Sequence, residues 1–290
     1  MPWAPELFSA PALARLEEQT HRKLVTVPYF EGLLTGELDA LIGSFAGAPE
    51  VHHPVRGRIK GARAFEAFMN ETNAWLHRNR VAVEEVEHVA IERAGFGEFV
   101  LSLDSETGHI RQPVAVMADR QPDGRIIELR IYSSSWPLTR HHPVRPPLLQ
   151  PDPNLRESDV IAEYRRALSA GDVEAIVAAF EPDGYAREPA GGTYMHRGHD
   201  GLRAFYEWWF SNGGGVPLEL CGLIDDTRAC AVEYNVVRWG RTELPPEAGV
   251  AVLVRGPTGK LAAARIYDSV KPPLGPRSHV STAIEGGHHE

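Results

Sequence analysis

Apolar residues in the second half of the chain recur at the spacing of a helix. Val160, Tyr164 and Leu168 lie four residues apart, so they share one helix face, and the pattern stops at Gly171. Glycine commonly ends helices, and Asp172 behind it is one of the residue types that best cap the start of the next one. The pattern therefore predicts two consecutive helices that meet at this glycine.

Further along, the pattern changes from helix to strand. A third helix is predicted for DGLRAFYEWWF, residues 200–210. Beyond it, apolar residues alternate with polar ones, as in half-buried strands, over residues 216–224, 229–239, 249–255 and 260–270. Helices followed by a run of antiparallel strands are typical of an α+β fold in which the helices pack on one face of a curved sheet.

The same order of elements occurs twice along the chain. RIYSSSWPL at residues 130–138 aligns with RIYDSVKPPL at residues 265–274, which sets an offset of 135 residues. At this offset residues 29–45 align with residues 164–180. The third helices align at an offset of 137 residues, so the second copy contains an insertion that is later compensated. A repeat of this length indicates one fold formed twice.

The repeat also sets the expected domain boundaries. We expect a first domain over residues 12–138 and a second over residues 156–274. Residues 139–155 are rich in proline, which favours an extended, semi-rigid linker. Residues 275–290 are expected to form a mobile tail.

Composition and charge exclude several classes of function. The 290 residues carry a formal net charge of −9, which opposes binding to nucleic acid because such binding relies on Lys and Arg that neutralise phosphates. No uninterrupted apolar run reaches the length of about 18 residues that a membrane span needs, so no membrane association is expected. The beginning of the chain lacks the pattern of a signal peptide, and we expect a cytoplasmic protein.

The order of elements, with the motifs Y…GDVEAIV…F…EP…RG…LRAFY, closely resembles the nuclear-transport-factor-2-like superfamily. That superfamily includes ketosteroid isomerases, SnoaL-like polyketide cyclases, limonene-epoxide-hydrolase-like enzymes and domains that only bind. The resemblance implies two cone-shaped α+β domains, each with three helices packed on a curved antiparallel sheet. Because single-domain relatives commonly pair, it also implies an intrachain pseudo-dimer and leaves a further homodimer open.

Within the superfamily, the second copy most resembles a ketosteroid isomerase. The resemblance implies that Tyr164 donates a hydrogen bond to a substrate oxyanion, that Glu188 is the base, and that Tyr206 supports the donor tyrosine. The second oxyanion donor of those enzymes aligns with Val252, which departs from the pattern because valine has no proton to donate. Val252 is therefore a candidate only for contact with the substrate. Independently, a carboxylate beside an apolar cavity is disfavoured in its charged form, which suits a base or an acid. A solvent-facing Glu188 and a packing role for Tyr164 stay open.

Further candidates in the second copy come from its last strand and its third helix. Asp268 ends the last strand on the face that the register assigns to the interior. A buried aspartate needs a partner or a proton, so Asp268 is a candidate second acid or substrate anchor, or else it bonds a neighbouring turn. Trp208 and Trp209 are candidates for cavity walls and for the core alike. His196, with Glu188 and Asp268, approximates the groups that SnoaL-like cyclases use, as the resemblance implies.

The first copy contains two candidates of its own. Tyr29 aligns with the donor Tyr164, and His53 stands at the position of the base in the first copy. Histidine is a suitable base near pH 7. The alternative is that His53, which precedes a proline, has a structural role. The remaining histidines lack the spacing and the accompanying residues of known metal sites. We therefore expect neither a metal nor a cofactor.

These residues point to a cofactor-independent acid–base enzyme. The expected reaction is an isomerisation, cyclisation or hydration/dehydration of a small, apolar, carbonyl-bearing molecule such as a polyketide, terpenoid or steroid-like compound. One alternative is a non-catalytic protein that binds small molecules or acts as a scaffold. A second alternative is an epoxide-hydrolase-like site, which the resemblance says needs an Asp–Arg–Asp group, and of which Asp268 and Arg238 are candidate members.

Overall fold

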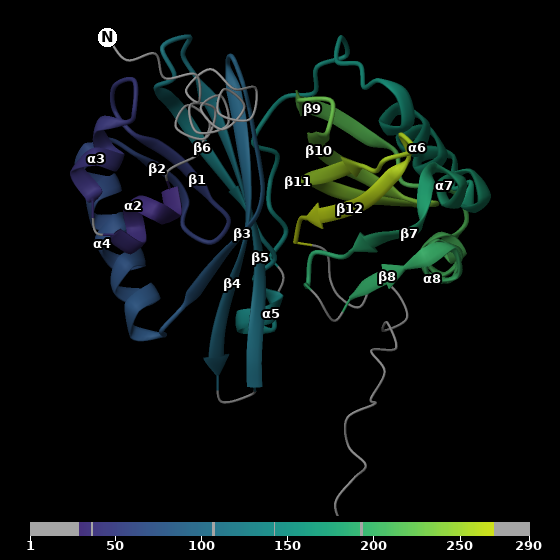
Figure 1. Ribbon diagram of the computed structural model, residues 1–290, viewed down its shortest axis with the longest axis horizontal. Helices are drawn as coiled ribbons and strands as arrows, with labels where there is room; N and C mark the ends of the chain where they lie inside the picture. Colours follow the sequence, from purple (N-terminus) through teal and green to yellow (C-terminus); the bar gives the residue numbers. More distant parts are fainter. Residues whose placement is uncertain (1–28, 36, 106–107, 142, 192–193, 270–290) are drawn as a thin grey trace, which may run out of the picture. The chain divides into compact units, whose positions relative to one another are not determined.

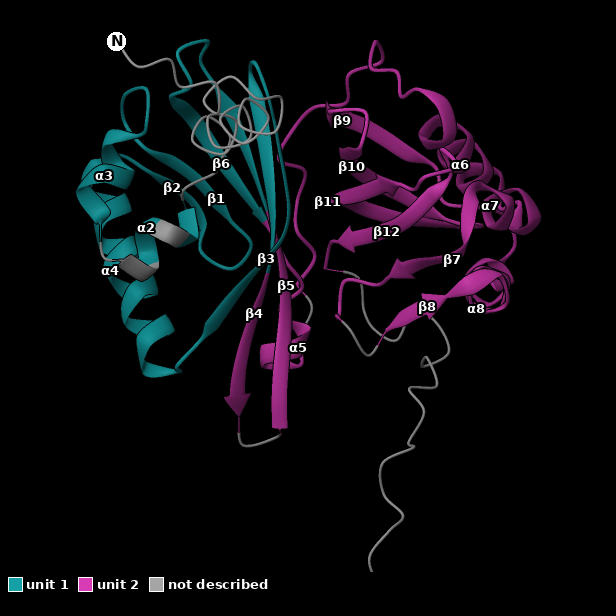
Figure 2. Cartoon of the chain, viewed as in Figure 1, with its two compact units in different colours: residues 1–99, 116–131 teal, residues 100–115, 132–290 magenta. Residues whose placement is uncertain are grey.

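The structure is a computed structural model that describes residues 29–269, apart from residues 36, 106–107, 142 and 192–193. The expected tail and the expected start of the first domain lie outside the described residues. The chain divides into two compact units (Figure 2). Unit 1 comprises the described residues up to Phe99 together with Val116–Ile131, and unit 2 comprises Val100–Ala115 and the described residues from Tyr132 onward. The domain boundaries expected from the repeat stay a prediction.

The first repeat forms one six-stranded sheet with three helices (Figure 1). The helices are α2 (Tyr29–Thr35), α3 (Leu38–Gly43) and α4 (Ala62–Arg78). The strands are β1 (Glu50–His53), β2 (Gly57–Lys60), β3 (Ala82–Ile91), β4 (Ala94–Ser105), β5 (Gly108–Arg120) and β6 (Ile126–Tyr132), in the order β2-β1-β6-β5-β4-β3.

The second repeat forms a sheet of the same design in unit 2. Its helices are α6 (Asp159–Ala170), α7 (Val173–Ala179) and α8 (Gly198–Trp209), with a 3₁₀ turn, η2 (Phe210–Asn212). Its strands are β7 (Phe180–Arg187), β8 (Met195–Arg197), β9 (Leu218–Asp225), β10 (Ala229–Trp239), β11 (Thr242–Arg255) and β12 (Leu261–Tyr267), in the order β8-β7-β12-β11-β10-β9. The order matches the first sheet strand for strand, which confirms the repeat and the α+β fold.

Strand pairing shows which residues of the two repeats are equivalent. In the first sheet β1 runs parallel to β6, with His52 opposite Arg130. In the second sheet β7 runs parallel to β12, with Arg187 opposite Arg265. Both pairs keep the offset of 135 residues that the sequence shows. The offset therefore identifies equivalent positions on the two sheets.

The helix boundaries of the second repeat agree with the pattern of its sequence. Gly171 follows α6 with a φ of 73°, a left-handed conformation that glycine adopts without strain. The side chain of Asp172 accepts a hydrogen bond of 3.0 Å from the backbone N–H of Ala175 and so caps α7. These two residues therefore end α6 and begin α7.

The connector between the repeats begins with a short helix, α5 (Trp136–Thr139). Its remaining described residues form no helix or strand but bond to the second sheet. Ala248 donates to the carbonyl of Arg145 over 2.9 Å, and Asp152 donates to the carbonyl of Leu220 over 2.8 Å. These bonds hold the connector against the second sheet. No helix in the described part of the chain is both long and apolar enough to cross a membrane.

Replacing Asp172 by alanine should lower the free energy of unfolding by about 1 kcal/mol, because the first turn of α7 loses its side-chain cap. Chemical denaturation would measure the change. Alanine at Asp183, an exposed residue on β7, is the matched control and should change little. Equal stability of the two variants would contradict the capping role.

Candidate active site

Unit 2 contains a cavity of about 470 Å³ that is walled mainly by apolar side chains. The wall comes from α6, α8 and strands β9 to β12, and Val144 of the connector completes it. Its tryptophans are Trp208, Trp209 and Trp239. The polar members that also line it are Glu157, Tyr164, Arg165, Tyr234, Glu247, Asp268 and Ser269. Such a site, apolar with a few polar groups, suits a small organic ligand.

Two tyrosine hydroxyls meet at the α6 side of the cavity. Tyr164 is buried on α6, and its Oη lies 2.8 Å from Oη of Tyr206 on α8. Burial raises the pKa of Tyr164 to about 12, although the hydrogen bond to Tyr206 works in the opposite direction. Both hydroxyls therefore keep their protons at neutral pH. When Tyr206 donates to Tyr164, the proton of Tyr164 is left for a ligand in the cavity.

A carboxylate and a third tyrosine lie at the end of the second sheet. Asp268 follows β12 and lines the cavity with Ile266, on the row that the register assigned to the interior. Its Oδ2 accepts a hydrogen bond of 3.1 Å from Oη of Tyr234 on β10. Burial, and then the negative charge of Asp268, raise the pKa of Tyr234 well above its ordinary value. Tyr234 therefore also stays protonated and holds Asp268 in place.

Glu247 on β11 is a cavity residue that the sequence analysis missed. Burial, followed by the negative charge of Asp268, raises the pKa of Glu247 from 4.5 to about 7. The backbone N–H of Ser269 donates to its Oε1 over 3.1 Å and partly opposes that shift. A carboxyl with a pKa in this range can serve as acid and as base near neutral pH.

Glu247 was missed because the predicted strand was shorter than β11. We expected a strand over residues 249–255, whereas the strand begins at Thr242 and includes two prolines, which are uncommon inside strands. Counting back in steps of two from the cavity residues Leu253 and Ala251 reaches Glu247. A strand that begins at Thr242 would have placed the side chain of Glu247 on the cavity face.

Glu188 and His196 form a buried pair that does not belong to the cavity wall. His196 Nε2 lies 2.7 Å from Oε1 of Glu188. The imidazole of His196 stacks on Phe205 at a centroid distance of 4.1 Å. Phe205 in turn contacts the ring of Tyr206 at a centroid distance of 4.8 Å, and burial, then Tyr164 and last the charge of Glu188 raise the pKa of Tyr206. The structure thus brings this pair close to Tyr206.

The other candidates of the second repeat have distinct environments. Trp208 is 40% exposed and lines the cavity at its rim. Trp209 also lines the cavity, and its carbonyl accepts a hydrogen bond of 2.8 Å from Trp239 Nε1. Val252 is fully buried between two cavity residues of β11, so its side chain points to the opposite face of the sheet. Arg238 is exposed and does not line the cavity.

The candidates of the first repeat are held by local contacts. His53 Nδ1 accepts hydrogen bonds of 3.1 Å from the backbone N–H groups of Val55 and Arg56. Its ring contacts the edge of Phe68 at a centroid distance of 5.3 Å. Tyr29 is buried, and burial raises the pKa of its hydroxyl far above the ordinary value. His53 Nδ1 is therefore occupied as an acceptor by its own turn.

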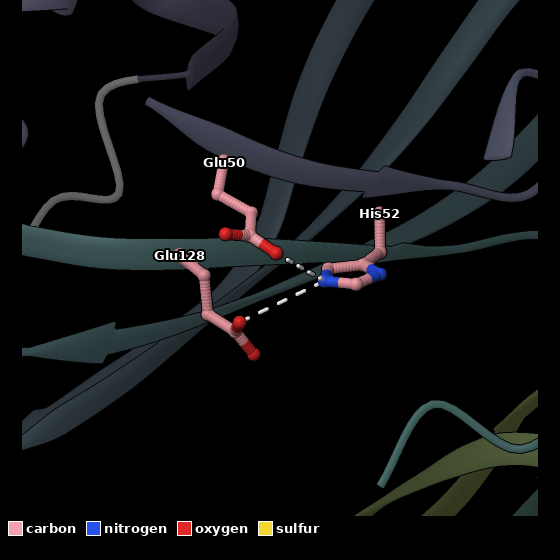
Figure 3. Close-up of side chains that lie close together, drawn as sticks. All are labelled: Glu50, His52 and Glu128. Atoms are coloured by element: carbon pink, nitrogen blue, oxygen red, sulfur yellow. Dashed lines mark ion pairs between the residues drawn. The ribbon is translucent and has the colours of Figure 1, made fainter. Parts of the chain in front are cut away.

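Unit 1 contains a cluster of possible metal ligands on its sheet, made of Glu50, His52 and Glu128 (Figure 3). Nε2 of His52 lies 3.4 Å from Oε1 of Glu50 and 3.7 Å from Oε2 of Glu128. All three side chains are partly buried. Two carboxylates and an imidazole have the chemistry of a divalent-cation site.

The oxygens of this cluster already have cationic partners. Glu50 bonds Arg58 at 2.5 Å and Lys60 at 2.7 Å, and these partners lower its pKa to about 2. Arg130 Nη1 donates to Glu128 over 2.5 Å. Three cations therefore surround two carboxylates. This arrangement fits an ion-pair network better than a metal site, because the neighbouring positive charges repel a metal ion.

The fold of unit 2 agrees with the architecture that the sequence led us to expect. It has a six-stranded sheet, covered by helices around an apolar cavity. Within it, residues 161–265 match the family model described as "SnoaL-like domain". No curated protein matches the chain.

Several solved structures are similar to part of the chain. A protein from Kribbella flavida is 25% identical, with 39% of this chain and 87% of that chain covered and a TM-score of 0.33. SalBIII, an epoxide hydrolase/cyclase-like enzyme of pyran ring formation in salinomycin, is 16% identical, with 39% and 90% covered and a TM-score of 0.32. A protein from Sinorhizobium meliloti named as a candidate polyketide cyclase is 19% identical, with 38% and 94% covered and a TM-score of 0.33.

The raised pKa of Glu247 predicts a pH-dependent cost in stability. Between pH 4.5 and about 7 the unfolded chain releases this proton while the folded protein keeps it, so the free energy of unfolding falls as the pH rises. Because Glu247 is only partly buried, the fall should be about 1–3 kcal/mol. Urea unfolding of the wild type and Glu247→Gln across this range should show the difference. Glu219→Gln, at an exposed position of β9, should run parallel to the wild type, and identical slopes in all three proteins would contradict the assignment.

Gly249 provides the space in which Tyr234 lies. A Cβ at this position would lie 2.6 Å from Cε2 and 2.7 Å from Oη of Tyr234. Gly249→Ala should therefore displace the phenol from Asp268 and lower the free energy of unfolding by about 1–3 kcal/mol, as measured by thermal unfolding. Gly43→Ala, where a Cβ meets nothing within 4 Å, is the control. An unchanged melting temperature in Gly249→Ala would show that Tyr234 does not depend on this space.

Proposed function

We propose that the cavity of unit 2 is the active site of an enzyme that uses its own side chains as acid and base on a small apolar molecule. The observation that carries the proposal is Glu247, a cavity carboxylate with a pKa of about 7, next to the charge of Asp268. A group with a pKa near the working pH transfers protons most effectively. Perturbed carboxylates inside clefts are also a common mark of catalytic sites.

The arrangement suits proton transfer next to a carbonyl group. Glu247, in its ionised form, removes a proton from the carbon beside the carbonyl and returns it at another position. Tyr164 donates a hydrogen bond to the carbonyl oxygen, which becomes negative as the proton leaves. The hydrogen bond from Tyr234 keeps Asp268 oriented, and burial together with the charge of Asp268 keeps the pKa of Glu247 high. Isomerisation, cyclisation and hydration or dehydration all use these steps.

The cavity wall supports a substrate with an apolar body. Three tryptophans and several aliphatic residues line it, and a flat ring system stacks well on such surfaces. Excluding water from an apolar cavity also strengthens the hydrogen bond from Tyr164 to a developing negative charge. We therefore propose a polyketide, terpenoid or steroid-like carbonyl compound as the substrate class.

The proposal gives Glu188 a supporting role. It pairs with His196 and acts on Tyr206, which in turn bonds Tyr164, so a change at Glu188 reaches the ligand through two hydroxyls. Epoxide opening has less support, because an Asp–Arg–Asp group is not assembled among the described cavity residues. Arg165 lines the cavity, but it forms an ion pair with Glu157.

Hydrogen–deuterium exchange at the carbon beside a carbonyl tests the proposed chemistry directly. Ligands would first be chosen by thermal shift from polyketide, terpenoid and steroid-like ketones, and exchange in D₂O would then be followed by NMR. The exchange rate should rise with pH and level off above about 7, where Glu247 is ionised. Glu247→Gln should lower the rate by about 10²–10⁴-fold. Glu188→Gln, away from the cavity wall, should lower it much less.

Binding and catalysis are separated by the same experiment. Ligand stabilisation that is equal in the wild type and Glu247→Gln, without exchange in either protein, would overturn the enzymatic proposal and identify a binding protein. A larger loss of exchange in Glu188→Gln than in Glu247→Gln would move the base from Glu247 to Glu188.

A further inference from the structure

Arg187 on β7 is a buried arginine with unused hydrogen-bond donors. Only 5% of the residue is exposed, and its Nε and Nη2 have no hydrogen-bond partner. The guanidinium lies over the ring of Tyr267, with Cζ 4.5 Å from the ring centroid. A buried positive charge without an acceptor is strongly unfavourable, and a ring face offsets only part of that cost.

The positions of Nε and Nη2 of Arg187 indicate which kind of hydrogen-bond acceptor fits them. Nε–H and Nη2–H lie on the same side of a guanidinium and point in parallel. This edge binds two oxygens of one carboxylate or phosphate group at once. A single water molecule cannot satisfy both donors as well as such a group can. The unused donors of Arg187 therefore match an oxyanion.

The first repeat has two carboxylates next to the position equivalent to Arg187, and the second repeat has uncharged residues in their place. His52 occupies the position equivalent to Arg187, and it lies next to the carboxylates of Glu50 and Glu128 (Figure 3). At the same offset the second repeat has Tyr185 in place of Glu50 and Ala263 in place of Glu128. Both carboxylates are thus replaced by residues without charge, and the imidazole is replaced by a guanidinium, which always carries a positive charge.

The surroundings of Arg187 add positive charge. Arg265, which is opposite Arg187 on β12, is also buried and donates from Nη1 to Oη of Tyr185 over 3.2 Å. Arg197 on the edge strand β8 is exposed, and its guanidinium lies 4.6 Å from the centroid of the Tyr185 ring. Three arginines therefore gather on one face of β8, β7 and β12. In a chain with a net charge of −9, this cluster attracts anions locally.

This face is separate from the cavity. Ala186 and Ala264, the strand neighbours of Arg187 and Arg265, belong to the apolar core on the helix side of the sheet. Because side chains alternate along a strand, the two arginines point to the opposite side. A ligand at Arg187 would therefore not enter the proposed active site.

We propose that Arg187, together with Arg265, binds an oxyanion, the carboxylate or phosphate group of a ligand, on the face of the second sheet opposite the cavity. The bound group supplies the negative charge that Glu50 and Glu128 supply within the first repeat. Arg197 draws the anion to the edge of the sheet. This site does not depend on the proposed enzymatic function.

The anion dependence of thermal unfolding tests the site. Wild-type protein would be titrated with sodium phosphate and, separately, with sodium acetate, at constant pH and at an ionic strength held constant with sodium chloride. A saturable rise of the melting temperature is expected with at least one of these anions. A response to phosphate alone assigns a phosphate group, and a response to acetate assigns a carboxylate.

Two variants should abolish anion binding, one by removing the donors and the other by supplying an internal carboxylate. Arg187→Met removes the donors, and Ala263→Glu restores the carboxylate found in the first repeat; each should weaken the response at least about tenfold. Ala263→Glu should also raise the melting temperature in chloride alone, because it supplies the missing partner. Arg203→Met, which removes an exposed arginine paired with Glu174, should keep the full response.

The outcomes separate the site from a general salt effect. No saturable response in the wild type, or an equal response in all four proteins, would overturn the proposal. Should Arg187→Met fail to fold, the comparison of Ala263→Glu with the wild type decides alone, since that variant retains every arginine.

Discussion

The hydrogen bond from Tyr234 to Asp268 is the interaction on which the cavity of unit 2 depends. It joins the middle of β10 to the residue that follows β12, and both groups are buried. A charged carboxylate in an apolar wall is stable only when it has such a partner. Burial, and then the charge of Asp268, raise the pKa of Glu247 to about 7. One buried bond thus positions one acid whose charge adds to the proton affinity of another.

Small residues make that bond geometrically possible. Gly249 lies opposite Tyr234 on β11 and leaves the space that the phenol occupies. On the helix side, Tyr164 and Tyr206 form a second bonded pair, and Glu188 with His196 lies next to it. These polar side chains in and beside the cavity are therefore bonded in pairs within an otherwise apolar interior. This pairing keeps buried polar atoms satisfied while leaving an apolar cavity for a ligand.

The two repeats keep one topology but differ in how each sheet treats charge. In unit 1 the sheet face at β1 and β6 balances cations with carboxylates, among them Glu50 and Glu128. At the equivalent place in unit 2 the carboxylates are gone and Arg187 is left with unused donors. Strand pairing and helix packing are unaffected by this change, because they depend on backbone and core residues. A duplicated fold can therefore change the chemistry of a surface without changing its architecture.

The sequence by itself determined the repeat, the order of elements, the α+β class, the helix boundary at Gly171 and Asp172, and the interior row that contains Asp268. Each of these follows from local periodicity or capping, which neighbouring residues specify. Only the tertiary structure decided that Glu247 reaches the cavity, that Glu188 pairs with His196, and that Arg187 Nε and Nη2 have no hydrogen-bond partner in the described part of the chain. These facts depend on strand length, on burial and on residues far apart in the chain, and local patterns do not specify them.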